Sequence, residues 1–139
     1  MATTTATITL ASNDIADNAL SISNTATLTT AGTDTGITET SGVARKKTSS
    51  GSNTVLIDSD AGIGVDITAD KSAKVYIKNV NDRGDGTKYV TILLTAVEIG
   101  RLYGGDWMFI PWCAASGKDI EFTPSDTTET TLEYTCFYE

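Results

Sequence analysis

Short segments in which apolar and polar residues alternate recur from residue 54 onward, and this pattern restricts the fold most. Turns rich in Gly, Asp, Asn or Ser separate them at intervals of about 8 to 12 residues, which is typical of a β-sandwich or barrel. The predicted strands are TVLID (54–58), VDIT (65–68), KVYIKNV (74–80), KYVTILLT (88–95), DWMFIPW (106–112), DIEFT (119–123) and TLEYTCFYE (131–139). Only TAVEIGRLY (95–103) could supply a helical turn, so we expect an all-β fold of two antiparallel layers around one core.

The alternation also predicts which side chains face that core. In the last strand, the phase that contains Phe137 is expected to face outward or to contact a neighbour, together with Thr131, Glu133 and Thr135. The predicted core residues are Val75, Ile77, Val90, Ile92, Leu94, Trp107, Phe109, Ile120, Phe122, Leu132, Tyr134 and Cys136.

The first fifty residues differ from the rest in composition. They are rich in Thr, Ser, Ala and Asn and contain no aromatic residue, and Thr makes up about one residue in six of the whole chain. Small apolar side chains such as Ile8, Leu10 and Leu20 alternate there, but each buries little area. We therefore divide the chain into an arm with short strands (1–50) and a β-sandwich (51–139). For residues 1–17, low-complexity disorder is an equal alternative.

The overall charge and the cysteine content limit partners and compartment. Ten Lys and Arg against eighteen Asp and Glu give a net charge of −8, which argues against nucleic-acid binding. No apolar run approaches the roughly 20 residues of a membrane span, and the N-terminal residues lack a signal-peptide pattern. We expect synthesis in a cytoplasm and free thiols at Cys113 and Cys136, although the two would be able to pair if their strands were neighbours.

The residues that most often carry chemistry are missing or scattered. The chain has no histidine, which removes the commonest general base and most transition-metal sites, so we expect no enzyme, no catalytic residue and no cofactor. A calcium site in a surface loop is the remaining metal hypothesis, but no closing Glu has the spacing of a calcium-binding loop. The acids considered for it are Asp58, Asp60, Asp66, Asp82 and Asp85.

Two stretches are candidates for protein contacts. Arg45, Lys46 and Lys47 form the basic cluster of VARKKTS (43–49), which is expected to be a solvated loop but could contact an acidic partner. Trp107 and Trp112 lie in the most apolar segment and should point to opposite faces of one strand. Because both faces of that strand are bulky, one of them is expected to join a subunit interface, as is Phe137.

The stretch NVNDRGDG (79–86) allows three interpretations. Arg83-Gly84-Asp85 matches an integrin-recognition tripeptide, the acids suggest a calcium loop, and Asp85-Gly86 is typical of a hairpin turn. Because alternating segments flank it, we favour the tip of a hairpin that joins residues 74–80 to 88–95.

The second half of the chain resembles small virion proteins of tailed bacteriophages. The resemblance lies in AKVYIKNVNDRGDGTKYVTILL, IGRLYGGDWMFIPW and DIEFTPSDTTETTLEYTCFYE, over roughly residues 73–139. It implies a jelly-roll-like capsid decoration (cement) protein, often a homotrimer, that binds the major capsid protein on the virion surface and stabilises the head. Another virion component (neck, tail or fibre) and a carbohydrate-binding sandwich with Trp112 and Tyr103 as its platform are the alternatives.

Overall fold

The structure, a computed structural model, describes residues 4–13, 20–28, 39–49, 51–59, 72–84, 87–113 and 116–138. These ranges contain strands and turns but no helix, which confirms the all-β prediction. They accordingly include no helix long and apolar enough to cross a membrane. The chain divides into two compact units, residues 1–38 and residues 39–139.

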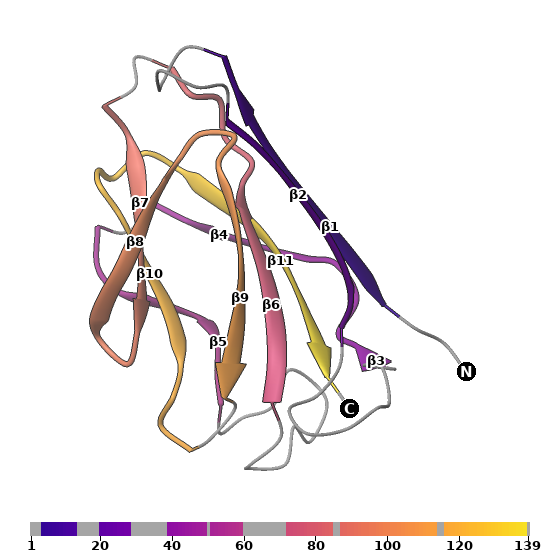
Figure 1. Cartoon of the computed structure of the whole chain (residues 1–139). Helices are drawn as coiled ribbons and strands as arrows, with labels where there is room; N and C mark the ends of the chain where they lie inside the picture. Colours follow the sequence, from indigo (N-terminus) through magenta and orange to yellow (C-terminus); the bar gives the residue numbers. More distant parts are fainter. Residues whose placement is uncertain are drawn as a thin grey trace. The chain divides into compact units, whose positions relative to one another are not determined.

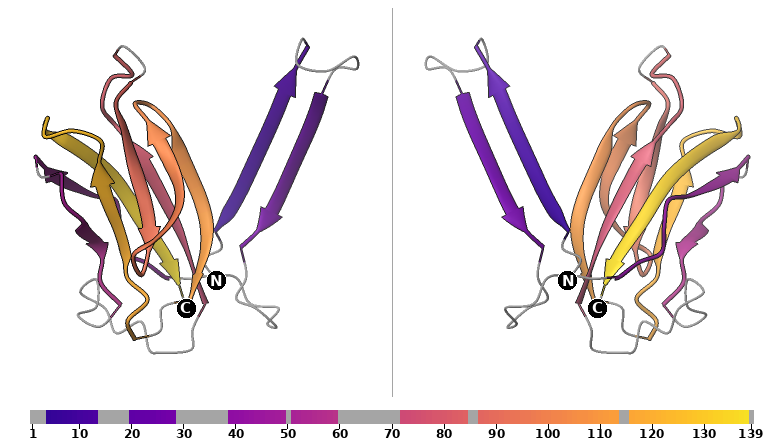
Figure 2. Two further views of the ribbon diagram at one scale, coloured as in Figure 1. Left: turned by 90° about the vertical axis from the view of Figure 1, so that its left-hand side faces the viewer. Right: turned by 90° about the vertical axis from the view of Figure 1, so that its right-hand side faces the viewer.

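The second unit is a sandwich of two antiparallel sheets (Figures 1 and 2). One sheet has the strand order β5-β10-β7-β8, and the other has the order β3-β11-β6-β9, with β4 also paired to β11. The strands are β3 (Glu39–Thr40), β4 (Ala44–Thr48), β5 (Thr54–Ile57), β6 (Ser72–Asn79), β7 (Tyr89–Leu94), β8 (Val97–Tyr103), β9 (Trp107–Cys113), β10 (Ile120–Pro124) and β11 (Thr130–Tyr138). We call the sheet that contains β6 and β11 the five-stranded sheet.

The strand pairs of this unit are nested within one another. β4 pairs with β11, β5 with β10, β6 with β9, and β7 with β8, each antiparallel. The unit is therefore one long hairpin of paired strands rolled into two layers, which is the jelly-roll arrangement. This confirms the expected fold class.

The innermost pair is β7–β8, whereas the sequence predicted a hairpin that joins residues 74–80 to 88–95. β6 and β7 lie in different sheets, so residues 80–88 connect the layers instead of closing a hairpin, and that prediction is wrong. The hairpin is β7–β8, with Thr95 and Ala96 at its tip in the left-handed region at φ 50° and 61°. Residues 95–103, expected as a possible helical turn, thus form the tip and strand β8, which pairs with β7 in a register that sets Val97 opposite Leu94 and Leu102 opposite Val90.

The tip is held by three hydrogen bonds to the neighbouring loop and strand. The Thr95 amide donates to the carbonyl of Asp119 (3.0 Å), and its hydroxyl donates to the carbonyl of Gly117 (2.9 Å). The Ala96 amide donates to a carboxylate oxygen of Glu121 (2.9 Å). These contacts keep two residues other than glycine in a conformation that they rarely adopt.

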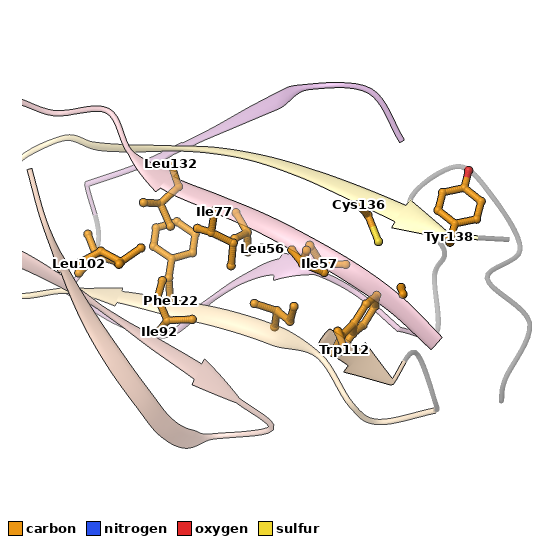
Figure 3. Packing of buried hydrophobic residues seen from close by; sticks show 14 residues of the cluster. Leu56, Ile57, Ile77, Ile92, Leu102, Trp112, Phe122, Leu132, Cys136 and Tyr138 are labelled. Atoms are coloured by element: carbon orange, nitrogen blue, oxygen red, sulfur yellow. The ribbon is translucent and has the colours of Figure 1, made fainter. Parts of the chain in front are cut away.

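The core lies between the two sheets, as Figure 3 shows for Phe122, Ile77 and Leu132. Most predicted core residues are buried or packed against the cluster, but Trp107 is exposed and Phe109 lies on the outer face of the sheet. In β9 the core phase is Met108, Ile110 and Trp112, so the phase predicted for this strand is wrong. Both phases of β9 are bulky, and therefore alternation alone could not choose between them.

The N-terminal unit is smaller than the arm predicted from composition. β1 (Thr5–Ser12) and β2 (Leu20–Thr27) form an antiparallel hairpin, drawn in indigo and violet in Figure 1. β3 and β4, assigned to the arm from their composition, instead pair with β11 and belong to the sandwich. The predicted strand 65–68 lies outside the described residues.

Candidate protein-binding face

The outer face of the five-stranded sheet carries a cluster of aromatic side chains. Tyr76 on β6 lies directly opposite Phe109 on β9 in the strand register. The rings of Tyr76 and Trp107 have centroids 6.3 Å apart, and those of Phe109 and Phe137 are also 6.3 Å apart, edge to face. Aromatic pairs at such separations attract each other beyond their burial. We call this cluster of four residues on three strands the aromatic face.

The aromatic face is only partly covered by the rest of the chain. Trp107 is 52% exposed, and the other three rings are half-buried. Burial raises the pKa of the Tyr76 hydroxyl, and the nearby Glu133 carboxylate raises it further. Tyr76 is therefore a neutral phenol at physiological pH, with no charge to desolvate when the face is covered.

Cations surround the aromatic face. Arg45 and Lys47 project from β4, and Lys74 and Lys78 flank Tyr76 on β6. Arg45 is paired with Glu133 at 2.8 Å, and Lys47 with Glu129 at 2.8 Å. We call these four residues the cationic margin. The two β4 side chains remain about two-thirds exposed, so the ion pairs contribute little to stability and can exchange for other partners.

The basic cluster was expected in a loop, and that prediction is wrong. Residues 44–48 form strand β4 along the edge of β11, where Arg45 lies opposite Glu133 and Lys47 opposite Thr131. The strand alternates, so Lys46 lies opposite Leu132 on the other side of the sheet. The three consecutive cations in ARKKT show no alternation of apolar and polar residues, so there was no sequence signal for this strand.

The predicted interface residues therefore separate into two groups. Arg45, Lys47, Trp107 and Phe137 share the outer face of the five-stranded sheet, although they come from distant parts of the chain. Trp112 is only 4% exposed, and its indole nitrogen donates a hydrogen bond to the carbonyl of Lys118 (2.8 Å). Trp112 is thus a core residue, and including it in an interface was wrong.

Tyr76 was not among the predicted site residues, and Phe109 was predicted in the core but lies on the outer face. Tyr76 sits between Lys74 and Lys78 in KVYIKNV, in the phase that alternation assigns to the outer face. That position was the available signal, because aromatic residues are enriched at protein interfaces relative to the rest of the surface.

Both cysteines are free, as expected. β6 separates β9 from β11, and in these strands Cys113 lies on the outer phase while Cys136 faces the core. Burial raises the pKa of the Cys136 thiol to about 12. Cys113 is exposed.

A cavity of about 380 Å³ lies at one end of the sandwich, between the loops that join β6 to β7 and β10 to β11. Several of its polar groups are engaged with one another: Lys88 contacts Asp126 and Thr128, and Asn81 contacts Asn79. Arg83 forms an ion pair with Asp106 and donates to the carbonyl of Gly104. The arginine of the RGD tripeptide is thus bound within its own chain, while Asp85 and Gly86 lie outside the described residues.

The structure also bears on the carbohydrate-binding platform and on the calcium site. The carbohydrate platform required exposed rings at Trp112 and Tyr103, but Trp112 is buried and Tyr103 packs against Tyr89 with centroids 5.6 Å apart. In the described ranges, no three acidic or thiol side chains gather where they could hold a metal. Asp60, Asp66 and Asp85, named for calcium, lie outside those ranges.

Comparisons with protein-family models, curated proteins and solved structures give no significant match to this chain.

Proposed function

We propose that this chain is a bacteriophage virion structural protein, a capsid decoration or cement protein that binds the major capsid protein lattice and stabilises the head. The observation that carries the proposal is the aromatic face with its cationic margin. It is an apolar, partly exposed surface on a rigid sheet, in a protein whose net charge is −8. The segments that resemble phage virion proteins extend from β6 to β11, and they include β6, β9 and β11, the strands that build this face.

The chemistry of the face suits a protein partner with acidic groups around an apolar patch. Trp, Tyr and Phe supply large contact areas at a small entropic cost, and such residues dominate binding energies at interfaces. Arg45 and Lys47 would exchange their present carboxylates for those of the partner. This exchange speeds association and sets specificity more than it adds affinity, so binding should weaken as salt is raised.

Binding of this kind stabilises a shell by mass action. A ligand that binds the assembled lattice, and not its separated subunits, adds its binding free energy to the assembled state. Many copies on one shell act together, so a moderate affinity at each site is sufficient. The protein would be made in the host cytoplasm and would reside on the virion surface, with no role for nucleic acid, a membrane or a cofactor.

The test is occupancy of phage heads that lack this protein. Full-length protein is added to such heads, and bound copies are counted after sedimentation. Trp107→Ala combined with Phe109→Ala should reduce apparent affinity at least about 30-fold, because two hot-spot rings are removed. Val97→Ala is the matched control, since it removes an exposed apolar side chain from β8 in the other sheet.

Two outcomes would contradict the proposal. Equal binding of the double variant and of Val97→Ala would remove the aromatic face from attachment. Absence of wild-type binding to heads, with binding to necks, tails or fibres seen by electron microscopy, would place the protein at one of those alternative virion positions.

A further inference from the structure

The edges of the two sheets of the sandwich differ in how well they are protected. Exposed edges attract further strands, and natural proteins block them with short strands, charged side chains or proline. β5 is only four residues long, β3 has two residues, β4 carries the three cations of the basic cluster, and β9 contains Pro111. β8 has seven residues and no proline, and its two charged residues, Glu98 and Arg101, have opposite signs.

The edge of β8 is open in the described part of the chain, where this strand pairs only with β7. Val97 is 65% exposed and Ile99 is 44% exposed, and the first five residues of the strand are all exposed. A strand added here would cover apolar side chains and pair with backbone donors and acceptors at the same time. β8 is therefore the edge of the sandwich at which strand addition gains most.

A β-bulge places the two charges of β8 on one face of the sheet. Glu98 and Arg101 lie opposite Leu93 and Thr91 of β7, and a register shift between these pairs leaves Ile99 as the extra residue. Leu93 and Thr91 are in the outer phase of β7, since the residue between them belongs to the core. Residues directly opposite share a face, so Glu98 and Arg101 both point outward although they are three positions apart.

We propose that two copies of this chain pair through β8, antiparallel and about a two-fold axis that passes between Ile99 and Gly100. In this register Glu98 of each copy lies opposite Arg101 of the other, and both side chains are on the outer face. The two sheets that contain β8 would continue into one another across the axis. The occupant of the open edge is thus the same edge of a second copy.

Side-chain direction and charge select this register. Val97 would lie opposite Leu102 of the other copy, and both belong to the core-facing phase, because they pair with core-facing positions of β7. A shift by one residue would set outward side chains opposite inward ones. The shifts that place Glu98 or Arg101 opposite its own equivalent would bring like charges together, which is destabilising.

The net charge of −8 on each copy does not prevent this contact. At 0.15 M salt the Debye length is about 8 Å, so distant charges on two copies are largely screened, whereas directly opposite Cβ atoms in a strand pair lie only about 5 Å apart. Both side chains are available for pairing. Arg101 stacks on the ring of Tyr89 at 4.5 Å, and neither it nor Glu98 forms an ion pair with another described residue.

The size of the contact sets its strength. Seven residues at about 3.3 Å each, in a sheet about 10 Å thick, give a strip of roughly 230 Å² on each copy. The total of about 460 Å² is well below the roughly 1,200 Å² of a standard interface, so the dimer belongs to the weak, transient class. We expect a dissociation constant between about 10 and 100 µM. The inference does not depend on the proposed function, because it concerns purified protein without a capsid.

The first experiment is sedimentation equilibrium of the full-length chain at concentrations from about 5 to about 500 µM in 0.15 M salt. The mass of wild type should rise from one copy to two. Larger species should not form, because a two-fold contact closes on itself. Arg101→Lys keeps the charge and should dimerise within about threefold of wild type.

The sharpest test reverses the two charges. Glu98→Arg sets Arg opposite Arg, and Arg101→Glu sets Glu opposite Glu, so each variant alone should associate at least about 10-fold more weakly. An equimolar mixture of the two variants should recover the association of wild type, because every outward pair is again Glu with Arg. Both variants keep a negative net charge, so overall attraction cannot explain recovery, and recovery also shows that both are folded.

A second measurement tests the register. In a Cys113→Ser background, copies with Glu98→Cys are mixed with copies that carry Arg101→Cys under oxidising conditions. A covalent dimer should form in the mixture and not with either variant alone. Equivalent residues lie three positions, about 10 Å, apart along the paired strands, which is beyond disulfide reach.

Several results would overturn the inference. They are a wild type that stays monomeric at about 500 µM, a wild-type homotrimer, a mixture that associates no better than its separate variants, and the absence of the mixed crosslink. Trp107→Ala should leave the dimer intact; if it dissociates the dimer, the copies meet at the aromatic face instead.

The two proposals remain distinguishable. Below about 1 µM the free chain would be monomeric, so head binding measured there does not report on β8. Loss of head binding with an intact dimer would contradict only the proposed function, and the reverse result only this inference.

Discussion

The sandwich and the arm are both antiparallel β-structure, but they differ in where their apolar side chains go. In the sandwich, side chains such as Ile77, Phe122 and Leu132 have no exposed surface because a second sheet covers them. In the arm, Leu10 and Ile22 occupy equally regular strands yet remain exposed. An alternating pattern is thus sufficient to form strands, while stability requires a second layer.

The sharpest test of this comparison is to shorten one apolar side chain in each region. Phe122→Ala should lower the free energy of unfolding of the sandwich by about 3–5 kcal/mol, because it leaves a cavity between the sheets. Ile22→Ala should change it by less than about 0.5 kcal/mol, as for an exposed position. Denaturant titration monitored by tryptophan fluorescence measures both. Equal losses would mean that the arm and the sandwich unfold as one unit.

A second test uses alkaline pH, which acts on the thiol of the buried Cys136. Because burial raises the pKa of Cys136 from 9.0 to about 12, its contribution to stability is complete below about pH 9 and is lost as the pH rises toward 12. At about pH 10.5 this loss should be on the order of 2 kcal/mol.

The control for this test is Cys136→Ala, which should lose less stability than wild type between pH 8 and about pH 10.5. Reaction with a thiol reagent at neutral pH should modify one thiol per native chain, and Cys113→Ser should abolish that reaction. Equal alkaline losses in wild type and Cys136→Ala would contradict the assignment.

The smallest expected effect concerns backbone strain, which the sandwich carries at the tip of β7–β8. Ala96→Gly should stabilise the chain by about 0.5–1 kcal/mol, since Gly adopts φ 61° without steric cost. Ala44→Gly, in strand β4, is the matched control and should destabilise by a similar amount. Thermal melts of the two variants should shift in opposite directions, and shifts in the same direction would argue against strain at Ala96.

The sequence was informative where one phase of a strand was clearly more apolar than the other. β6 shows this, because Val75 and Ile77 alternate with Lys74 and Lys78, and both its existence and its core phase were predicted correctly. In β9 every position is bulky, so the phase was undetermined and Trp107 was placed in the core. Tertiary pairing with β6 decided it.

The connections between strands and the aromatic face could not be predicted from the sequence as well as the single strands were. Turn residues between β6 and β7 suggested a hairpin, since local chemistry does not reveal that a connection crosses between layers. The aromatic face combines β6, β9 and β11, and its margin adds β4, so no single stretch of sequence contains it. Only the nested pairing brings Arg45 beside Glu133.

That nested pairing also dictates an order of events during synthesis. β4 emerges early, but its partner β11 is made ninety residues later, as the pairing of Ala44 with Tyr134 shows. Until then β6 also lacks one neighbour, and its apolar phase has no complete layer to cover it. The arm hairpin needs only local contacts and can form first. A nascent chain paused before β11 would therefore present adhesive strand edges, and rapid completion of the last strand protects it from aggregation.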